Sequence, residues 1–152
     1  MPSFQTKHAV DHSVDEMFAL VADVEKYPKF VPLCQSLDVK GRRELADGST
    51  MLVADMTVAY KVFKETFTSR VTLRPTDQEI LVEYLDGPFR HLENRWNFVA
   101  LEDNRSEVCF YIAYEFKSRA LSALMGTMFD RAFRKFSDAF EARADEIYGA
   151  TA

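Results

Sequence analysis

The stretch SRALSALMGTMFDRAFRKFSDAFEARADEIY, Ser118–Tyr148, contains no proline and only one glycine, Gly126. Apolar residues, most of them large, recur in it at three- and four-residue steps, which predicts one long helix with a broad apolar face. These residues are Leu121, Leu124, Met125, Met128, Phe129, Ala132, Phe133, Phe136 and Phe140. Gly149 is the expected C-terminal stop. Such a helix must bury its apolar face against another element.

The chain before this helix alternates apolar and polar residues from about residue 35 onward, as half-buried strands do. Turn-forming residues interrupt the alternation at 45–50, 74–79, 86–89 and 101–106. Upstream, SFQTKHAV (Ser3–Val10) also alternates, and Ser13 and Glu16 have the spacing of a capping box before a short helix. Pro28 and Pro32 then allow only a helical turn or loop.

This order of elements predicts an α+β fold in a single domain, residues 1–152. An antiparallel sheet of about six or seven strands must cover its apolar face, and only the last helix is long enough to do so. We therefore expect a curved sheet wrapped around the C-terminal helix, a helix-grip arrangement, with two short helices after the first strand.

Composition limits the function. The chain has 152 residues, 47% hydrophobic residues, 13 Phe, and a net charge of −5 that disfavours nucleic-acid binding. Cys34 and Cys109 lie too far apart for a metal motif and are expected to be reduced. No signal peptide and no span of roughly 20 apolar residues is present. We expect a cytoplasmic protein, soluble or peripheral to the inner membrane.

Three stretches carry a resemblance to a known family: FALVADVEKYPKFVPLC (Phe18–Cys34), FKETFTSRVTLRP (Phe63–Pro75) and YLDGPFRHLENRWNF (Tyr84–Phe98). Together with the phenylalanine-rich last helix, they resemble the START-like superfamily of polyketide cyclase/dehydrase and lipid transport proteins. Within it the chain is similar to the coenzyme Q-binding family, which includes bacterial ribosome association toxins. The resemblance covers nearly the whole chain.

The resemblance implies an apolar cavity between sheet and helix that binds ubiquinone or a related isoprenoid lipid. The protein would be a quinone chaperone or carrier that supports respiration or quinone synthesis, in contact with membrane enzymes. The alternatives are a ribosome-binding inhibitor of subunit association and a cyclase-type enzyme. The expected lining residues are Tyr27, Phe30, Val31, Pro32, Leu33, Phe63, Phe67, Pro88, Phe89, Leu92, Trp96, Phe110, Met125, Met128, Phe129 and Phe133.

The segment YPKFVPLC (Tyr27–Cys34) is the expected lip of this cavity. Its prolines stiffen the chain, so Phe30, Val31 and Leu33 could stay partly exposed at a ligand entrance or a membrane contact. The alternative is an ordinary loop whose aromatic residues pack into the core. DGPF (Asp86–Phe89) would supply the facing rim.

No motif indicates catalysis, a catalytic cofactor or a metal. His8, His12 and His91 stand outside any nucleophile or metal pattern. Glu65 shares a predicted strand face with Phe63 and would be a buried carboxylate if that face points inward. A rim position, or pairing with Arg70 or Arg95, is the more ordinary expectation. The basic run KGRR (Lys40–Arg43) is expected to be solvated, or to help docking on anionic lipid.

Overall fold

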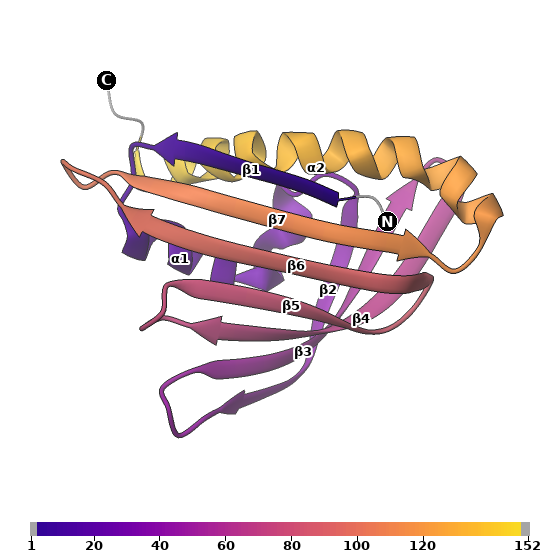
Figure 1. The fold of residues 1–152 in the computed structure, drawn as a ribbon, viewed down its shortest axis with the longest axis horizontal. Helices are drawn as coiled ribbons and strands as arrows, with labels where there is room; N and C mark the ends of the chain where they lie inside the picture. The colour runs from indigo at the N-terminus through magenta and orange to yellow at the C-terminus, as the bar shows by residue number, and fades with distance from the viewer. Residues whose placement is uncertain (1–2, 150–152) are drawn as a thin grey trace.

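A computed structural model describes residues 3–149 of the chain (Figure 1). The elements follow in the order β1 (Ser3–Val10), α1 (Val14–Ala22), the 3₁₀-helix η1 (Val24–Lys29), β2 (Cys34–Glu44), β3 (Thr50–Tyr60), β4 (Phe63–Arg74), β5 (Glu79–Asp86), β6 (Phe89–Ala100), β7 (Ser106–Phe116) and α2 (Arg119–Tyr148). The predicted α+β order is confirmed, with seven strands and two short helices after the first strand.

Local signals in the sequence place the helix ends. The Ser13 side chain accepts a hydrogen bond from the Glu16 backbone N–H, and the Glu16 carboxylate accepts one from the Ser13 N–H, which closes the capping box of α1. Ser118 caps α2 in the same way by accepting from the Leu121 N–H. At the other end, Gly149 follows the last turn at φ +90°.

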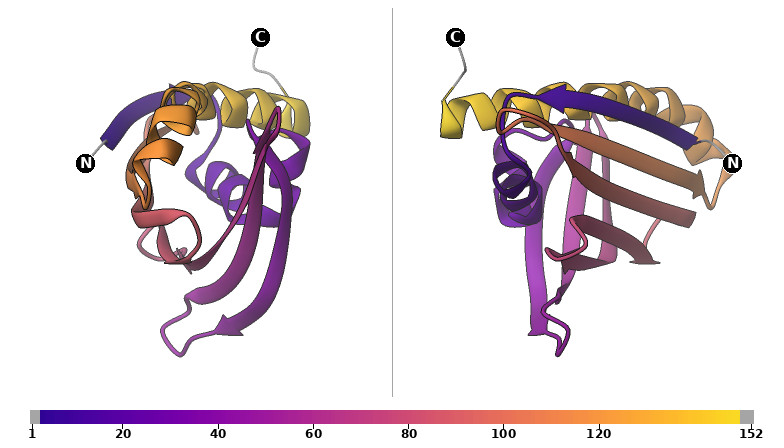
Figure 2. Two further views of the ribbon diagram at one scale, coloured as in Figure 1. Left: turned by 90° about the vertical axis from the view of Figure 1, so that its right-hand side faces the viewer. Right: turned by 60° about the vertical axis from the view of Figure 1, so that its left-hand side comes forward.

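The seven strands form one antiparallel sheet in the order β1-β7-β6-β5-β4-β3-β2. The sheet is strongly curled, and α1 and η1 lie between its two walls (Figure 2). Helix α2 runs along β1 and β7 at one edge (Figure 1). Among residues 3–149, no helix is long and apolar enough to cross a membrane.

The inner face of α2 matches the predicted stripe except at its start. Met125, Phe129, Ala132, Phe133 and Phe140 are buried. Leu124, however, is 55% exposed, so its predicted place in the buried stripe is wrong. The first turns of α2 extend beyond the part of the sheet that could cover them, whereas the later turns pack against β1, β7 and α1.

Two histidine–carboxylate contacts join the second half of α2 to the N-terminal segment, one from His8 of β1 and one from His12, which follows β1. His8 Nε2 lies 2.8 Å from Glu141 Oε1, and His12 Nε2 lies 2.7 Å from Asp145 Oδ1. Both pairs join residues that are 133 positions apart. Glu141 and Asp145 are four residues apart and therefore lie on the same face of α2. Because both carboxylates are bound, the two contacts fix the rotation of α2 as well as its position.

Gly87, in the turn between β5 and β6, allows the backbone of this turn to approach Phe67 closely. Its φ is +144°, and a Cβ placed there would lie 2.6 Å from the Phe67 Cβ and 2.9 Å from the Phe67 Cα. Both the backbone conformation and the space at this position therefore require glycine.

We expect Gly87→Ala to lower the free energy of unfolding by about 2–4 kcal/mol, since strain and a backbone clash add together. Urea unfolding measures the change. Gly41→Ala is the matched control, because a Cβ at Gly41 meets nothing within 4 Å; its effect should stay within about 0.5 kcal/mol. Equal stability of the two variants would contradict this assignment.

Candidate functional site

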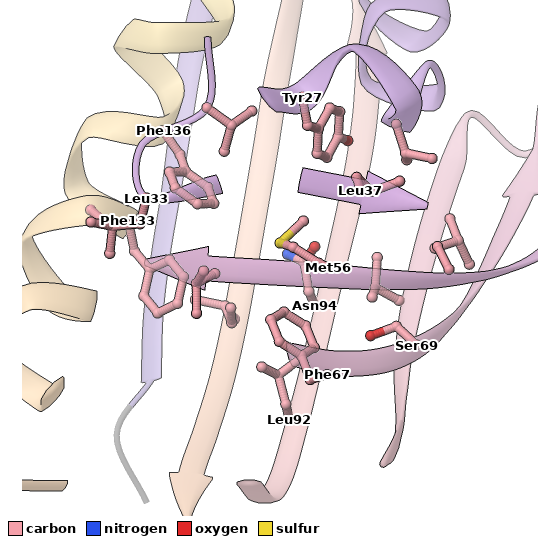
Figure 3. A pocket seen from close by; sticks show the side chains of 18 of the residues that line it. Tyr27, Leu33, Leu37, Met56, Phe67, Ser69, Leu92, Asn94, Phe133 and Phe136 are labelled. Carbon is pink, nitrogen blue, oxygen red and sulfur yellow. The ribbon is translucent and has the colours of Figure 1, made fainter. Parts of the chain in front are cut away.

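An apolar cavity of about 110 Å³ lies between the inner face of the sheet and α2 (Figure 3). Strands β2 to β7, the segment from η1 to β2, and α2 all contribute to its walls. The lining residues are Val24, Tyr27, Val31, Pro32, Leu33, Leu37, Ala54, Met56, Val58, Phe67, Ser69, Val71, Ile80, Val82, Phe89, Leu92, Asn94, Trp96, Ile112, Phe129, Ala132, Phe133, Phe136 and Phe140. None of them carries a charge.

The structure brings ten of the sixteen expected lining residues to this cavity: Tyr27, Val31, Pro32, Leu33, Phe67, Phe89, Leu92, Trp96, Phe129 and Phe133. The other six are absent from the lining: Phe30, Phe63, Pro88, Phe110, Met125 and Met128. Phe110 and Met125 are core residues behind the wall, 1% and 2% exposed. Phe63 and Met128 are only partly buried against the core. Their predicted role as ligand contacts remains a prediction.

The segment Tyr27–Cys34 belongs to the core more than the sequence indicated. Tyr27 is buried and its hydroxyl donates to the Val21 carbonyl, and this burial raises the pKa of Tyr27 well above its usual range. Phe30 packs edge-to-face on Phe140, with 5.0 Å between ring centroids. Val31, expected to be partly exposed, is only 6% exposed. For Val31 that expectation is wrong, because its N–H donates to the Tyr27 carbonyl at 2.8 Å and its side chain packs in the core.

Leu33 both borders the cavity and is partly exposed, as expected for a residue at a cavity entrance. It has φ +67°, a conformation that costs a leucine roughly 1–2 kcal/mol. Its carbonyl accepts from the Ala59 N–H at 3.0 Å, which ties the segment to β3. In Figure 3 the Leu33 side chain lies near Phe133 and Phe136 of α2.

Two polar residues in the cavity wall were not singled out by sequence reasoning. Ser69 lies between Phe67 and Val71 on the inner face of β4, and Asn94 lies between Leu92 and Trp96 on the inner face of β6. The available signal was a polar residue at an inward position of an otherwise apolar alternation. Figure 3 shows both side chains on the sheet wall of the cavity.

The Phe89 end of the cavity is held by backbone and ring contacts. The Phe89 N–H donates to the Tyr84 hydroxyl at 3.1 Å. The Phe89 ring packs edge-to-face on Phe67 and Tyr84 and stacks on Phe116 at 4.8 Å between centroids. Phe89 therefore forms part of one wall as a buried residue. Pro88 is absent from the lining, and the role of Asp86–Phe89 as the rim of an entrance remains a prediction.

Glu65 does not enter the cavity. It is partly buried on β4 but is absent from the lining residues. The expected arginine partners bind other carboxylates: Arg70 pairs with Glu83 at 3.1 Å and Arg95 with Glu93 at 3.6 Å. Glu65 shares the strand face of Phe67 and Ser69 but lies outside the lining, which agrees with the expected rim position. The expected pairing with Arg70 or Arg95 is wrong.

One group of possible metal ligands occurs in the described part of the chain. Single ligand atoms of His8, Asp138 and Glu141 lie within 4.8 Å of one another. The group is on the outside of the β1–α2 contact, partly or fully exposed, and His8 and Glu141 already contact each other. We assign it the structural role described above.

The basic run Lys40–Arg43 lies at the exposed end of β2. Arg42 pairs with Glu25 at 3.3 Å, and Lys40 Nζ lies 3.9 Å from Asp55. Exposed pairs of this kind contribute about 0–1 kcal/mol each. Two of the three cations thus have acidic neighbours, which weakens the expectation of docking on anionic lipid.

Comparison with known proteins gives consistent results. The model of the family described as polyketide cyclase / dehydrase and lipid transport matches residues 10–141. The ribosome association toxin RatA of Escherichia coli K12 is 31% identical over 150 residues, which cover 99% of this chain and 91% of that protein. The mitochondrial coenzyme Q-binding protein COQ10 homolog B of Xenopus laevis is 33% identical over 141 residues, covering 90% of this chain and 55% of that protein.

A solved structure shares the architecture and a third of the sequence. The solution structure of an 18 kDa protein from Caulobacter crescentus superposes with a TM-score of 0.79 at 33% identity. The match covers 99% of this chain and all of that chain. The likeness therefore extends over the cavity walls as well as the sheet.

The thiol of Cys34, beside the cavity, provides a test of its local environment. Burial raises the pKa of the Cys34 thiol from 9.0 to about 11. We expect iodoacetamide to alkylate Cys34 slowly at pH 8 in a Cys109→Ser variant, because roughly one thiol in a thousand is then ionised. The rate should rise about tenfold per pH unit toward pH 11.

The same shift affects stability. The native state keeps the Cys34 thiol neutral, so its contribution to stability is complete below pH 9 and is lost as the pH rises toward 11.

Mass spectrometry of the iodoacetamide-labelled protein gives the alkylation rates. A labelling rate that reaches its plateau near pH 9 would show that Cys34 is accessible to water.

Proposed function

The chain belongs to the polyketide cyclase / dehydrase and lipid transport family, and we propose that it binds ubiquinone or a related isoprenoid lipid in the cavity between the sheet and α2. It acts as a carrier or chaperone rather than as an enzyme, and it supports respiration or quinone synthesis. It works in the cytoplasm and contacts the inner membrane peripherally when it takes up or delivers its ligand.

The observation that carries this proposal is the uncharged lining of the cavity. An apolar chain gains roughly 0.8 kcal/mol for each methylene that it buries, before the entropy costs of binding are subtracted. Aromatic rings and Met56 give the walls a surface that adapts to an isoprenoid or acyl chain. The relative named a coenzyme Q-binding protein supports the choice of a quinone.

The cavity must widen before it can take up a whole isoprenoid lipid. Its volume of about 110 Å³ is below the roughly 300–1,000 Å³ of typical ligand pockets. A ligand of this size therefore requires wall side chains to move. Leu33, which is partly exposed and held at positive φ, is the residue whose movement we propose first.

The cyclase alternative lacks its proposed acid. Glu65, which sequence reasoning considered, is absent from the cavity lining. The lining offers Ser69, Asn94 and the Tyr27 hydroxyl as polar groups, and Tyr27 already donates to the Val21 carbonyl. The pKa of Tyr27 is raised by burial, and the other lining residues are neither acids nor bases. Such a wall favours ligand binding over proton transfer.

We expect ubiquinone to be extracted into organic solvent from protein purified from a quinone-producing bacterium, and to be identified by mass spectrometry. Ala132→Leu should then lower the amount of bound quinone about tenfold or more. Ala132 is buried on α2 and lines the cavity, so three added carbon atoms fill it.

The control is Ala142→Leu, which adds the same side chain to an exposed position of the same helix. It should retain the quinone content of the wild-type protein. The proposal fails if the wild-type extract holds no quinone or other lipid and the protein takes up no added decylubiquinone.

Inhibition of ribosomal subunit association is the second candidate function. It is favoured by the 31% identity to a ribosome association toxin over 99% of the chain. Co-sedimentation with purified large subunits at low and at physiological salt tests it. Under our proposal the protein stays in the supernatant under both conditions; a protein that pellets with the large subunit at physiological salt would favour the toxin-like function.

A further inference from the structure

The Ser69 hydroxyl is a buried polar group without a partner. Ser69 is 5% exposed, and within residues 3–149 its Oγ has no hydrogen-bond partner. Its neighbours on the same strand face, Phe67 and Val71, both line the cavity. Figure 3 shows the Ser69 oxygen on the cavity side of β4. Because leaving a buried hydroxyl unpaired is costly, a serine at this position needs an explanation.

Asn94 presents a second polar group to the same cavity, and its orientation is fixed by the core. The Trp96 indole N–H donates to Asn94 Oδ1 at 3.0 Å, and Asn94 Nδ2 donates to the Tyr111 carbonyl at 2.9 Å. An indole nitrogen only donates, so its partner must be the amide oxygen. One N–H of Asn94 remains after these two bonds.

The strand register fixes the separation of the two groups. Ser69 stands opposite Tyr84 and Asn94 opposite Val82, so β5 separates the two residues, with an offset of two residues along the strand. Two strand spacings and this offset correspond to roughly 12 Å between their backbones. Both side chains therefore face one region of the sheet wall, across the cavity from Phe133 and Phe136 (Figure 3).

The chemistry of the wall selects the kind of head group. Ser69 and Asn94 each offer a donor, whereas none of the lining residues is charged. A carboxylate or phosphate buried there would lack a counterion, at a large cost in free energy. A neutral group with carbonyl or ether oxygens would instead satisfy the donors.

We propose that the Ser69 hydroxyl donates to a carbonyl oxygen on the head group of a neutral quinone, and that the remaining N–H of Asn94 donates to a second oxygen of the same head group. The inference rests on the proposed function and adds the orientation of the ligand: the ring lies against β4 and β6, and the isoprenoid tail leaves along α2. Fatty acids and phospholipids bind, if at all, through their tails alone.

The test compares two ligands with the same ten-carbon chain, decylubiquinone and decylbenzene, by calorimetric titration of the wild type and Ser69→Ala. Loss of one hydrogen bond should weaken decylubiquinone binding about 3- to 10-fold. Binding of decylbenzene should change less than twofold. Val71→Ala, which shortens an apolar neighbour on the same face, is the matched control and should weaken both ligands to a similar degree.

Stability of the ligand-free protein is an independent readout. Ser69→Ala removes a buried hydroxyl without a partner, so it should raise the melting temperature by about 2–4 °C. A lower melting temperature would show that the hydroxyl has a partner in the free protein and would overturn the inference. Unchanged binding of decylubiquinone by Ser69→Ala would overturn it as well. If the wild type binds neither ligand, the proposed function itself fails, and the inference with it.

Discussion

Edge-to-face packing around Phe140 holds the structure together. The Phe140 ring lies 4.9 Å from Trp96, 5.4 Å from Tyr27 and 5.0 Å from Phe30, measured between centroids. These contacts join α2 to β6 and η1, three elements that are distant in sequence. Aromatic pairs of this geometry contribute about 0.5–1.5 kcal/mol each beyond the area that they bury. The contacts of His8 on β1 and of His12, which follows β1, then hold the same half of α2.

The cavity follows from how the sheet curls away from this anchored helix. α2 packs mainly against β1, β7 and α1, at one edge of the sheet. The opposite wall must be bridged by side chains, and three of those that face the gap are small: Ala54 of β3, Ser69 of β4 and Ala132 of α2. Large aromatic residues surround them. The cavity therefore exists because small residues occur where the two walls are far apart.

The same wall distinguishes a binding site from a catalytic one. Its polar groups are neutral and, apart from the Ser69 hydroxyl, mostly engaged within the protein. Such groups orient a neutral ligand through hydrogen bonds but do not move protons at neutral pH. The ionisable residues that sequence reasoning considered lie elsewhere, with Glu65 outside the lining and His8 and His12 at the β1–α2 contact.

The sequence by itself determined the element order, because hydrophobic periodicity, Ser13, Ser118 and Gly149 act over a few residues along the chain. It also indicated ten of the residues that line the cavity, since inward faces follow from strand alternation. Only the tertiary structure decided which inward residues border empty space, because that depends on the distance between walls far apart in sequence. For this reason Phe110 became core, Phe30 packed against α2, and Ser69 entered the site.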